Sequence, residues 1–275
     1  MQPTFHIEAS NIDLSLAHLV LEAGPQGISI VVIDGKNCFV SVIIYSFPSA
    51  TGIPEYITHL EEIIKAEKLL EGAYSKTDII WAFPESILVP PDHHDATISG
   101  DMLDLVFGDL EKTTTRNDFL FRHNLHNIYR VPSVISDAFA QRFPLAGQTH
   151  QFSLLADRVE QPGNHLLAVF YSNSLTVLLR KAGQLQVIRN FNYQAPDDAA
   201  WCLLNICSRF EVEPNDTVLH LSGMIDTGSA LYAEVNKYFL HIDMGGLPEK
   251  AEYAEQIIKQ PAHYFSHLFA SVLCV

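Results

Sequence analysis

The sequence predicts an α/β protein built from two similar halves, and three observations support this prediction. Each half contains three short apolar runs separated by turn residues, in residues 18–47 and again in residues 165–193. Each set is followed by an amphipathic helical pattern, and each helix by a further short strand. Strands joined by tight turns pair antiparallel, whereas a strand reached through a helix lies parallel to its predecessor. Each half is therefore predicted to be strand-strand-strand-helix-strand, with more helix after it.

The turns within each set of strands carry the residues that tight connections need. They lie at residues 24–27, 34–37, 172–174 and 181–184, and all but the third contain glycine. Glycine supplies the positive φ of such turns, and asparagine and aspartate tolerate it. We therefore expect a three-stranded antiparallel meander in each half.

A helix is expected after each meander, over residues 54–74 and over residues 196–210. In the first helix, apolar residues recur at spacings of three and four, with Glu and Lys on the other face. Pro196 suits the first position of the second helix, and the two aspartates after it favour the positive end of the helix dipole. The strands that follow the two helices begin at Asp78 and Asp216.

The last strands of the two meanders differ in their side chains. Residues 38–47 are apolar on both alternating faces, so both faces of this strand are expected to be covered. In residues 184–193, one face carries Gln184, Gln186, Asn190 and Asn192. That face is expected to be open to water or to a partner.

The remaining segments complete each half. The first half is expected to continue with a loop and short helix after residue 84, strands around 119–125 and 128–131, a helix over 132–143, a linker over 144–151 and a short helix over 152–159. The second half is expected to continue with a helix over 232–239, a strand over 240–244 and a terminal helix from about residue 250. We place the boundary near Gly147, which gives an N-terminal subdomain of residues 1–147 and a C-terminal subdomain of residues 148–275.

Net charge and apolar patterning exclude two classes of partner. Lys and Arg total 17 and Asp and Glu total 32, so the formal net charge is −15. A phosphate backbone repels an acidic surface without a basic patch, so we expect no nucleic-acid binding. The densest apolar stretch, residues 38–47, is far shorter than the ~20 residues that span a bilayer. Because the first residues also lack a basic and apolar leader, the chain is expected to be cytoplasmic, with no membrane span.

The chain contains four cysteines, and none of them forms a C-x-x-C pair. We expect free thiols and no disulfide framework. Cys202 and Cys207 lie on the helix expected over residues 196–210, where filling the core is their expected role.

The order of these elements resembles the actin-like ATPase fold, which is ribonuclease H-like. That superfamily includes actin, heat-shock chaperones, sugar kinases, and bacterial division and pilus-assembly proteins, and its two β-β-β-α-β-α subdomains clamp a nucleotide. The stretches 126–132 and 261–265 further resemble an uncharacterised bacterial family of about this length, which looks like a degenerate member of the superfamily. The resemblance implies the fold and an internal duplication, and brings no function with it.

The nucleotide motifs of the superfamily are only partly present in the two hairpins. Its first hairpin usually carries Asp-x-Gly, whose carboxylate acts through the Mg²⁺ shell and whose backbone N–H groups bind phosphates. This chain has Glu22 and Gly24 there, followed by Pro25, which removes one N–H donor. At the second hairpin, residues 171–174 contain neither a carboxylate nor a glycine. The resemblance therefore implies a degenerate phosphate-binding site.

The turn that contacts adenosine in the superfamily usually has paired glycines. Here it contains Ser222 and Gly223, with Gly228 a few residues later. The resemblance thus gives four candidate nucleotide-cleft residues, which are Glu22, Gly24, Ser222 and Gly223. It gives no catalytic residue, and the chain has no Walker-type phosphate loop and no G-x-S-x-G motif.

Several histidine-containing groups were weighed as metal sites, and none is assigned. Residues 92–95 read Asp-His-His-Asp and are interpreted as an exposed polar loop, with a metal site as the alternative. His263 and His267 are expected on one face of a helix, where packing is their expected role. His123 and His126 flank a turn between two strands. The apolar run 264–275 is expected to pack as a helix, with a docking face as the alternative.

Two hypotheses from different classes follow. The first is a non-catalytic actin-like scaffold or adaptor with an unidentified protein partner and no cofactor. The second is a nucleotide-dependent switch or enzyme that uses ATP and Mg²⁺, with Glu22 at the metal shell and Gly223 near the base. A small-molecule pocket between the subdomains is a third alternative. Because ATP turnover needs metal and phosphate groups aimed within fractions of an ångström, the degenerate motifs favour the first hypothesis.

Overall fold

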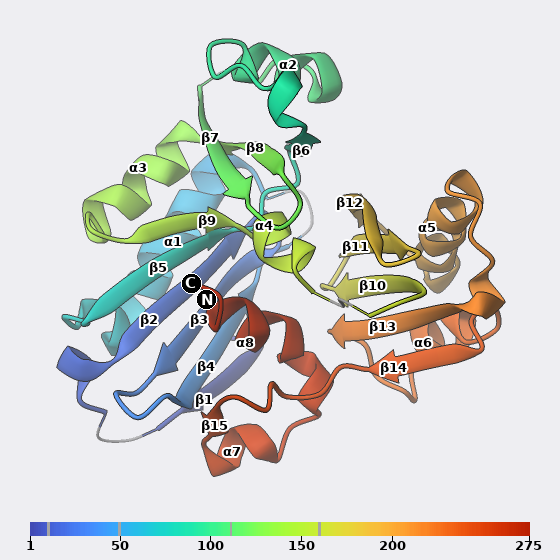
Figure 1. Cartoon of the computed structure of the whole chain (residues 1–275). Coiled ribbons are helices and arrows are strands. Elements are labelled where there is room, and N and C mark those ends of the chain that lie inside the picture. Colours follow the sequence, from blue (N-terminus) through green and yellow to red (C-terminus); the bar gives the residue numbers. More distant parts are fainter. Residues whose placement is uncertain (10–11, 49–50, 111, 159–160) are drawn as a thin grey trace. The chain divides into compact units, whose positions relative to one another are not determined.

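The computed structural model describes residues 1–9, 12–48, 51–110, 112–158 and 161–275 (Figure 1). The chain forms two compact units, and each is described by itself. Unit 1 comprises residues 1–153, 249–259 and 275, and unit 2 comprises residues 154–248 and 260–274.

The centre of unit 1 is a mixed sheet in the order β1-β4-β3-β2-β5-β9, with β15 also paired to β4. Its strands are β1 (Phe5–Glu8), β2 (His18–Gly24), β3 (Gly27–Ile33), β4 (Cys38–Ser46), β5 (Lys76–Trp81), β9 (Gly147–His150) and β15 (Glu252–Tyr253). The predicted meander is confirmed, because β2, β3 and β4 pair antiparallel. The predicted crossover is also confirmed, because β5 lies parallel to β2. The structure adds β9, which pairs with β5 inside the stretch expected to be a linker.

One face of this sheet is packed by α1 (Ile53–Ala66), which buries Tyr56, Leu60 and Ile63. The helix is shorter than the 54–74 range expected from the sequence. Glu67 ends it by adopting an extended conformation, with φ −98° and ψ 100°, and a short 3₁₀ helix follows at Lys68–Glu71. The backbone at Glu67 therefore turns the chain between the two helices.

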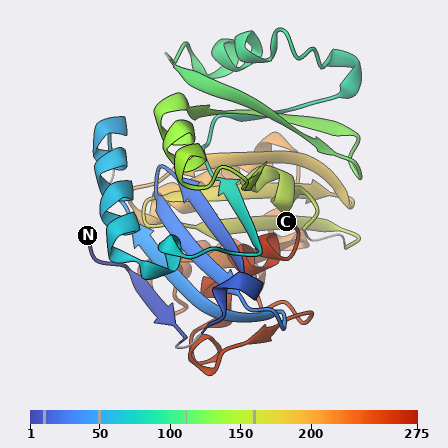
Figure 2. The ribbon, with the colours of Figure 1, turned by 90° about the vertical axis from the view of Figure 1, so that its left-hand side faces the viewer.

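Unit 1 also contains a three-stranded antiparallel sheet in the order β6-β8-β7. Its strands are β6 (Ser86–Val89), β7 (Thr113–Leu120) and β8 (Leu125–Pro132), and the nearby helices are α2 (Ser99–Phe107), α3 (Ser133–Arg142) and α4 (Gln151–Ala156). Figure 2 shows the long β7–β8 hairpin with α2 beside it. Leu103 of α2 packs against Val89 and Ile128 in a small apolar cluster. The strand pair predicted at 119–125 and 128–131 is therefore present, but its first strand is displaced, since β7 spans Thr113–Leu120 and residues 121–124 form the turn.

Unit 2 is built on a five-stranded sheet in the order β12-β11-β10-β13-β14. The strands are β10 (Asn164–Phe170), β11 (Ser174–Lys181), β12 (Gln184–Asn192), β13 (Thr217–Gly223) and β14 (His241–Met244), with helices α5 (Pro196–Arg209) and α6 (Ala230–Val235). The second meander and its parallel crossover strand are confirmed. Gln184, Gln186 and Asn192 of the edge strand β12 are exposed, as the polar face predicted. Cys202 and Cys207 are buried in the core of this unit.

The terminal helix predicted from about residue 250 is wrong. In its place are β15, α7 (Glu255–Ile258), a 3₁₀ turn at Ala262–Tyr264 and α8 (Ser266–Val272). Pro261 lies between α7 and the turn, and it interrupts a helix because it has no N–H to donate and its ring clashes with the carbonyl four residues earlier. The helix expected over 232–239 is likewise shorter and ends at Val235. No helix among the described residues has the length and apolar character to span a bilayer.

Residues 249–259 lie in unit 1, whereas the sequence placed them in the C-terminal subdomain. The reason is pairing with β4, since the Ala254 N–H donates to the Phe39 carbonyl at 2.9 Å. The rings of Phe39 and Tyr253 also stack with their centroids 5.2 Å apart. The assignment of residues 1–147 and 148–275 to two actin-like subdomains stays a prediction.

Candidate functional site

Glu22 lies near the end of β2, inside unit 1. Its side chain is buried, and the Gln151 side-chain amide donates a hydrogen bond to Oε2 at 3.1 Å. The neighbouring strands hold the backbone, with Glu22 opposite Ser29 of β3 and Ile80 of β5. The carboxylate predicted to act at a metal shell is therefore engaged by a side chain at the start of α4.

Gly24 ends β2 at a point where two strands approach closely. A Cβ added there would lie 2.8 Å from the Ala82 carbonyl oxygen and 3.0 Å from the Ala82 Cβ. The Ala82 N–H donates to the Ala23 carbonyl at 2.8 Å, which holds the two segments together. Close approach of backbone is a sufficient reason for glycine at this position.

A buried polar network lies beside the Glu22–Gln151 pair. His150 Nδ1 accepts a hydrogen bond from the Phe152 N–H, so its Nε2 carries the proton and donates to the Phe83 carbonyl at 2.8 Å. Burial lowers the pKa of His150 to about 4. Asp118 Oδ2 accepts from Thr149 Oγ1, the His150 N–H and Ser153 Oγ, at 3.0, 2.8 and 2.6 Å. The sequence did not reveal this network, because its members come from the loop after β5 and from β7, β9 and α4.

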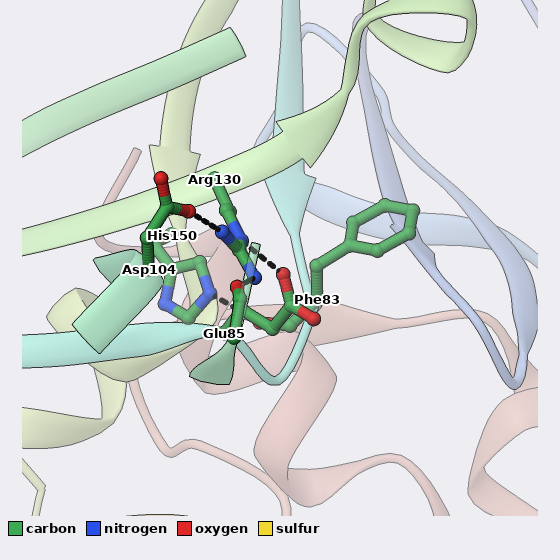
Figure 3. Close-up of polar contacts among 6 residues, drawn as sticks. Phe83, Glu85, Asp104, Arg130 and His150 are labelled. Atoms are coloured by element: carbon green, nitrogen blue, oxygen red, sulfur yellow. Dashed lines mark hydrogen bonds and ion pairs between the residues drawn. The ribbon is translucent and has the colours of Figure 1, made fainter. Parts of the chain in front are cut away.

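A buried arginine organises the three-stranded sheet of unit 1 (Figure 3). The Arg130 guanidinium of β8 lies between the carboxylates of Glu85 and Asp104, and it forms an ion pair with each. Its third contact is a hydrogen bond to the Gly108 carbonyl at 2.8 Å. The Arg130 side chain is 2% exposed. Arg130 therefore ties β8 to the segment before β6 and to both ends of the last turn of α2.

In unit 2, Ser222 lies near the end of β13 and contacts the segment that leads into α8. Its hydroxyl is 2.9 Å from His267 Nδ1 and 2.7 Å from Ser266 Oγ, and it receives the His267 N–H at 3.1 Å. His267 is buried, and burial lowers its pKa to about 3. The Ser222 hydroxyl is therefore committed to contacts within unit 2.

Gly223 ends the pairing of β10 and β13. Its φ is +84°, which L side chains rarely adopt, and an added Cβ would collide with the Phe170 carbonyl oxygen. The same carbonyl accepts a hydrogen bond from the Met224 N–H at 2.7 Å. Strand pairing and backbone conformation both require glycine here.

We expect Gly223→Ala to destabilise unit 2 by about 2–3 kcal/mol, because strain at positive φ and a backbone collision add together. Urea unfolding followed by near-ultraviolet circular dichroism measures the change. Gly246→Ala is the matched control, since a Cβ at Gly246 meets nothing within 4 Å and its φ is not positive. Equal stability of the two variants would contradict the structural role given to Gly223.

The four predicted residues therefore form two neighbouring pairs. Glu22 and Gly24 lie two residues apart on β2 in unit 1, and Ser222 and Gly223 are adjacent on β13 in unit 2. Each pair stands near the carboxyl end of a strand that lies inside its sheet. Within each unit, the side chains are hydrogen-bonded to the protein and the glycines are required by strand geometry.

The histidine-containing groups that the sequence offers as metal sites contact other protein groups. His94 stacks on His126 with ring centroids 3.8 Å apart, and the Asp95 carboxylate accepts hydrogen bonds from Thr97. His263 and His267 do not share a helix, which corrects the sequence interpretation, because His263 lies in the 3₁₀ turn before α8. His263 Nε2 is 2.7 Å from the Ile225 carbonyl, so both histidines hold the end of unit 2 together.

Comparison with solved structures identifies the fold. A Bacteroides thetaiotaomicron protein with an actin-like ATPase fold and unknown function matches with a TM-score of 0.77 at 15% identity, covering 97% of this chain and 100% of that chain. PilM, from a PilM–PilN type IV pilus biogenesis complex, matches with a TM-score of 0.57 at 12% identity, covering 93% and 98%. The ethanolamine utilization protein EutJ of Carboxydothermus hydrogenoformans matches with a TM-score of 0.50 at 7% identity, covering 94% and 89%. These likenesses confirm the actin-like ATPase fold that the order of elements implied.

Comparison with curated proteins gave no match. A family model described as "protein of unknown function (DUF3822)" matches residues 8–242. That range includes both meanders, both crossover helices and all four predicted cleft residues. The chain therefore belongs to the DUF3822 family, whose model covers most of this actin-like fold.

Proposed function

We propose that this chain is a non-catalytic actin-like scaffold or adaptor, which acts by binding a protein partner and does not turn over ATP. The observation that carries the proposal is the engagement of the motif residues. Gln151 donates to the Glu22 carboxylate, and Ser222 is surrounded by polar groups of residues 263–267. A nucleotide would have to replace these contacts before it could use either side chain.

The two glycines of the motifs, Gly24 and Gly223, independently support the proposal that the chain does not turn over ATP. In nucleotide-binding members of such folds, a glycine lets the backbone approach a phosphate. In this chain, packing against Ala82 accounts for Gly24, and pairing with Phe170 accounts for Gly223. Neither glycine requires a ligand to explain its presence.

A partner surface is available on α2 of unit 1. Leu105 is 88% exposed and Val106 is 53% exposed, whereas Leu103 of the same helix is buried. Adjacent exposed aliphatic side chains on one helix suit the apolar segment of a protein partner. The proposal of a protein partner is also supported by the PilM–PilN complex, in which a protein of similar fold is assembled with another protein.

The docking surface is tested by replacing its exposed aliphatic side chains with charged ones. We expect the double variant Leu105→Asp, Val106→Asp to lose a partner that the unaltered protein captures, at an unchanged melting temperature. Leu145→Asp is the matched control, because Leu145 is also exposed and lies elsewhere in unit 1. A partner retained by the double variant would move the docking surface away from α2.

Nucleotide binding is tested by thermal unfolding with and without millimolar Mg·ATP, Mg·ADP and a non-hydrolysable analogue. A ligand at about 100 times its Kd adds about 2.7 kcal/mol to folding stability. That would raise the Tm by several degrees, at ~2–4 °C per kcal/mol for a protein of this size class. We expect no shift and no phosphate release.

A nucleotide-dependent switch is the second candidate function, and one observation favours it. Gly223 turns the backbone at the carboxyl end of the parallel strand β13, and α/β folds place their ligands at such strand ends. A clear shift with Mg·ATP that Glu22→Gln abolishes would support this candidate and contradict the adaptor. A shift that Glu22→Gln leaves unchanged would also contradict the adaptor, and would place the nucleotide elsewhere.

A further inference from the structure

We propose that His6, Glu8 and Glu67 form a binding site for one divalent transition-metal ion, with Zn²⁺ as the best match. The three residues belong to unit 1 and lie apart from the residues assigned to the proposed function. The proposal stands on three independent features, which are the spacing of the ligand atoms, the burial of one carboxylate and the local charge.

The ligand atoms have the spacing of a coordination polyhedron. His6 Nε2 lies 3.7 Å from Glu8 Oε2 and 3.6 Å from Glu67 Oε2, and all three atoms lie within 4.8 Å of one another. Zinc binds nitrogen and oxygen at about 2.0–2.2 Å, so two ligands at tetrahedral positions are about 3.4 Å apart. The observed separations are close to that value, and small side-chain rotations would close them.

The fold brings the three residues together across the edge of the sheet. His6 and Glu8 are two apart on β1, so they point to the same face. They stand opposite Ile43 and Ser41 of β4, and Tyr45 lies on that face of β4 as well. Glu67 reaches the same place from the turn that ends α1. Because 58 residues separate Glu8 from Glu67, no local motif reveals the group.

One ligand is buried and already oriented. The Glu67 side chain is 7% exposed, and its Oε1 accepts a hydrogen bond from the Tyr45 hydroxyl. Hydrogen bonds of this kind, made to the second atom of a ligand, orient metal-binding carboxylates. Glu67 Oε2 is left facing His6, without a hydrogen bond among the described residues.

The local charge of the site is negative, which favours binding of a cation. Two carboxylates meet one imidazole, and no Lys or Arg of the described chain forms an ion pair with Glu8 or Glu67. A buried carboxylate is costly unless it is paired or coordinates a metal. A divalent ion would balance the charges of both carboxylates.

The donor set favours particular metals. An imidazole with two carboxylates suits zinc, manganese and similar ions, whereas Mg²⁺ and Ca²⁺ prefer all-oxygen sites. Three protein ligands leave at least one position for water or for a group from a partner. The His6 and Glu8 side chains are 44% and 38% exposed, which gives an ion a path from solvent.

The test is a titration of the full, tag-free chain with Zn²⁺ by isothermal calorimetry, and with Co²⁺ by visible absorption. We expect one ion to bind per chain. We also expect the visible absorption bands of bound Co²⁺ to have the high intensity that is typical of tetrahedral coordination. His6→Ala and Glu67→Gln are expected to weaken binding more than 100-fold, and Tyr45→Phe about 10-fold, since loss of an outer hydrogen bond costs roughly 10–100-fold in affinity.

Two control variants keep the test specific. Glu61→Gln changes an exposed carboxylate on α1, and His93→Ala changes an exposed histidine in the loop after β6. Both are expected to bind Zn²⁺ like the unaltered chain. Absence of Zn²⁺ binding by the unaltered chain would overturn the proposal. So would binding that His6→Ala and Glu67→Gln leave intact while their folding is confirmed by circular dichroism.

Discussion

Replacing Arg130 with leucine is expected to destabilise unit 1 by about 3 kcal/mol, which is the lower end of the cost of removing one partner from a buried ion pair. The guanidinium is 2% exposed, and its removal leaves Glu85 and Asp104 facing each other. The cost stays at the lower end because these carboxylates are 28% and 43% exposed and regain water. Urea unfolding measures the loss, and amide hydrogen exchange locates it in α2.

Two further variants make this expectation specific. Arg116→Leu on the neighbouring strand is the matched control, because among the described residues Arg116 makes one side-chain hydrogen bond, to Ser136 at 3.0 Å. We expect it to cost about 1 kcal/mol, the typical worth of a single hydrogen bond. Adding Glu85→Gln and Asp104→Asn to Arg130→Leu should restore part of the lost stability by removing the facing charges. If Arg116→Leu costs as much as Arg130→Leu, the ion pairs do not explain the role of Arg130.

Acid is expected to destabilise both units, because each contains a histidine that folds in its neutral form. Burial lowers the pKa of His150 to about 4 and that of His267 to about 3, from 6.5 in the unfolded chain. Below pH 6.5 the unfolded chain therefore binds more protons than the folded chain, and stability falls as the pH falls. Each group removes about 1.4 kcal/mol per pH unit until its folded pKa is reached. Between pH 6.5 and about pH 4.5 this amounts to about 2 kcal/mol for each unit.

Urea unfolding over a pH series measures the slope, and substitution assigns it. His267→Gln keeps a polar group beside Ser222 and removes the titrating imidazole. We therefore expect the pH dependence of the unfolding free energy of unit 2 to fall by the contribution of one proton. His93→Gln, at an exposed position, should leave both slopes unchanged. An unaltered slope in His267→Gln would mean that His267 is not the group that takes up the proton.

The meanders could be predicted from the sequence because their signals are local. Turn glycines and alternating apolar residues lie within a few positions of each other, and the crossover helices follow directly. The end of the chain could not be predicted in the same way. Residues 252–253 become a strand because β4 is available to pair with them, and no residue near them encodes that neighbour.

The candidate site shows the same division. The glycines and the motif positions Glu22 and Ser222 could be found by comparison with a known pattern. Their hydrogen-bond partners could not, because Gln151 is 129 residues from Glu22 and His267 is 45 residues from Ser222. The structural role of Arg130 could not be predicted for the same reason, since its carboxylate partners come from two other segments.

The pairing of β15 with β4 has a consequence for synthesis of the chain. Translation delivers all of residues 154–248 before the strand that completes the edge of the first sheet. Unit 1 therefore cannot reach its final form while its own first 153 residues are the only part outside the ribosome, although domains commonly fold in order of synthesis. Until then the first residues of β4, Cys38 and Phe39, lack the strand that pairs with them, and their free backbone groups can pair with another extended segment. A nascent chain paused within unit 2 should thus be the form of this protein that most needs a chaperone.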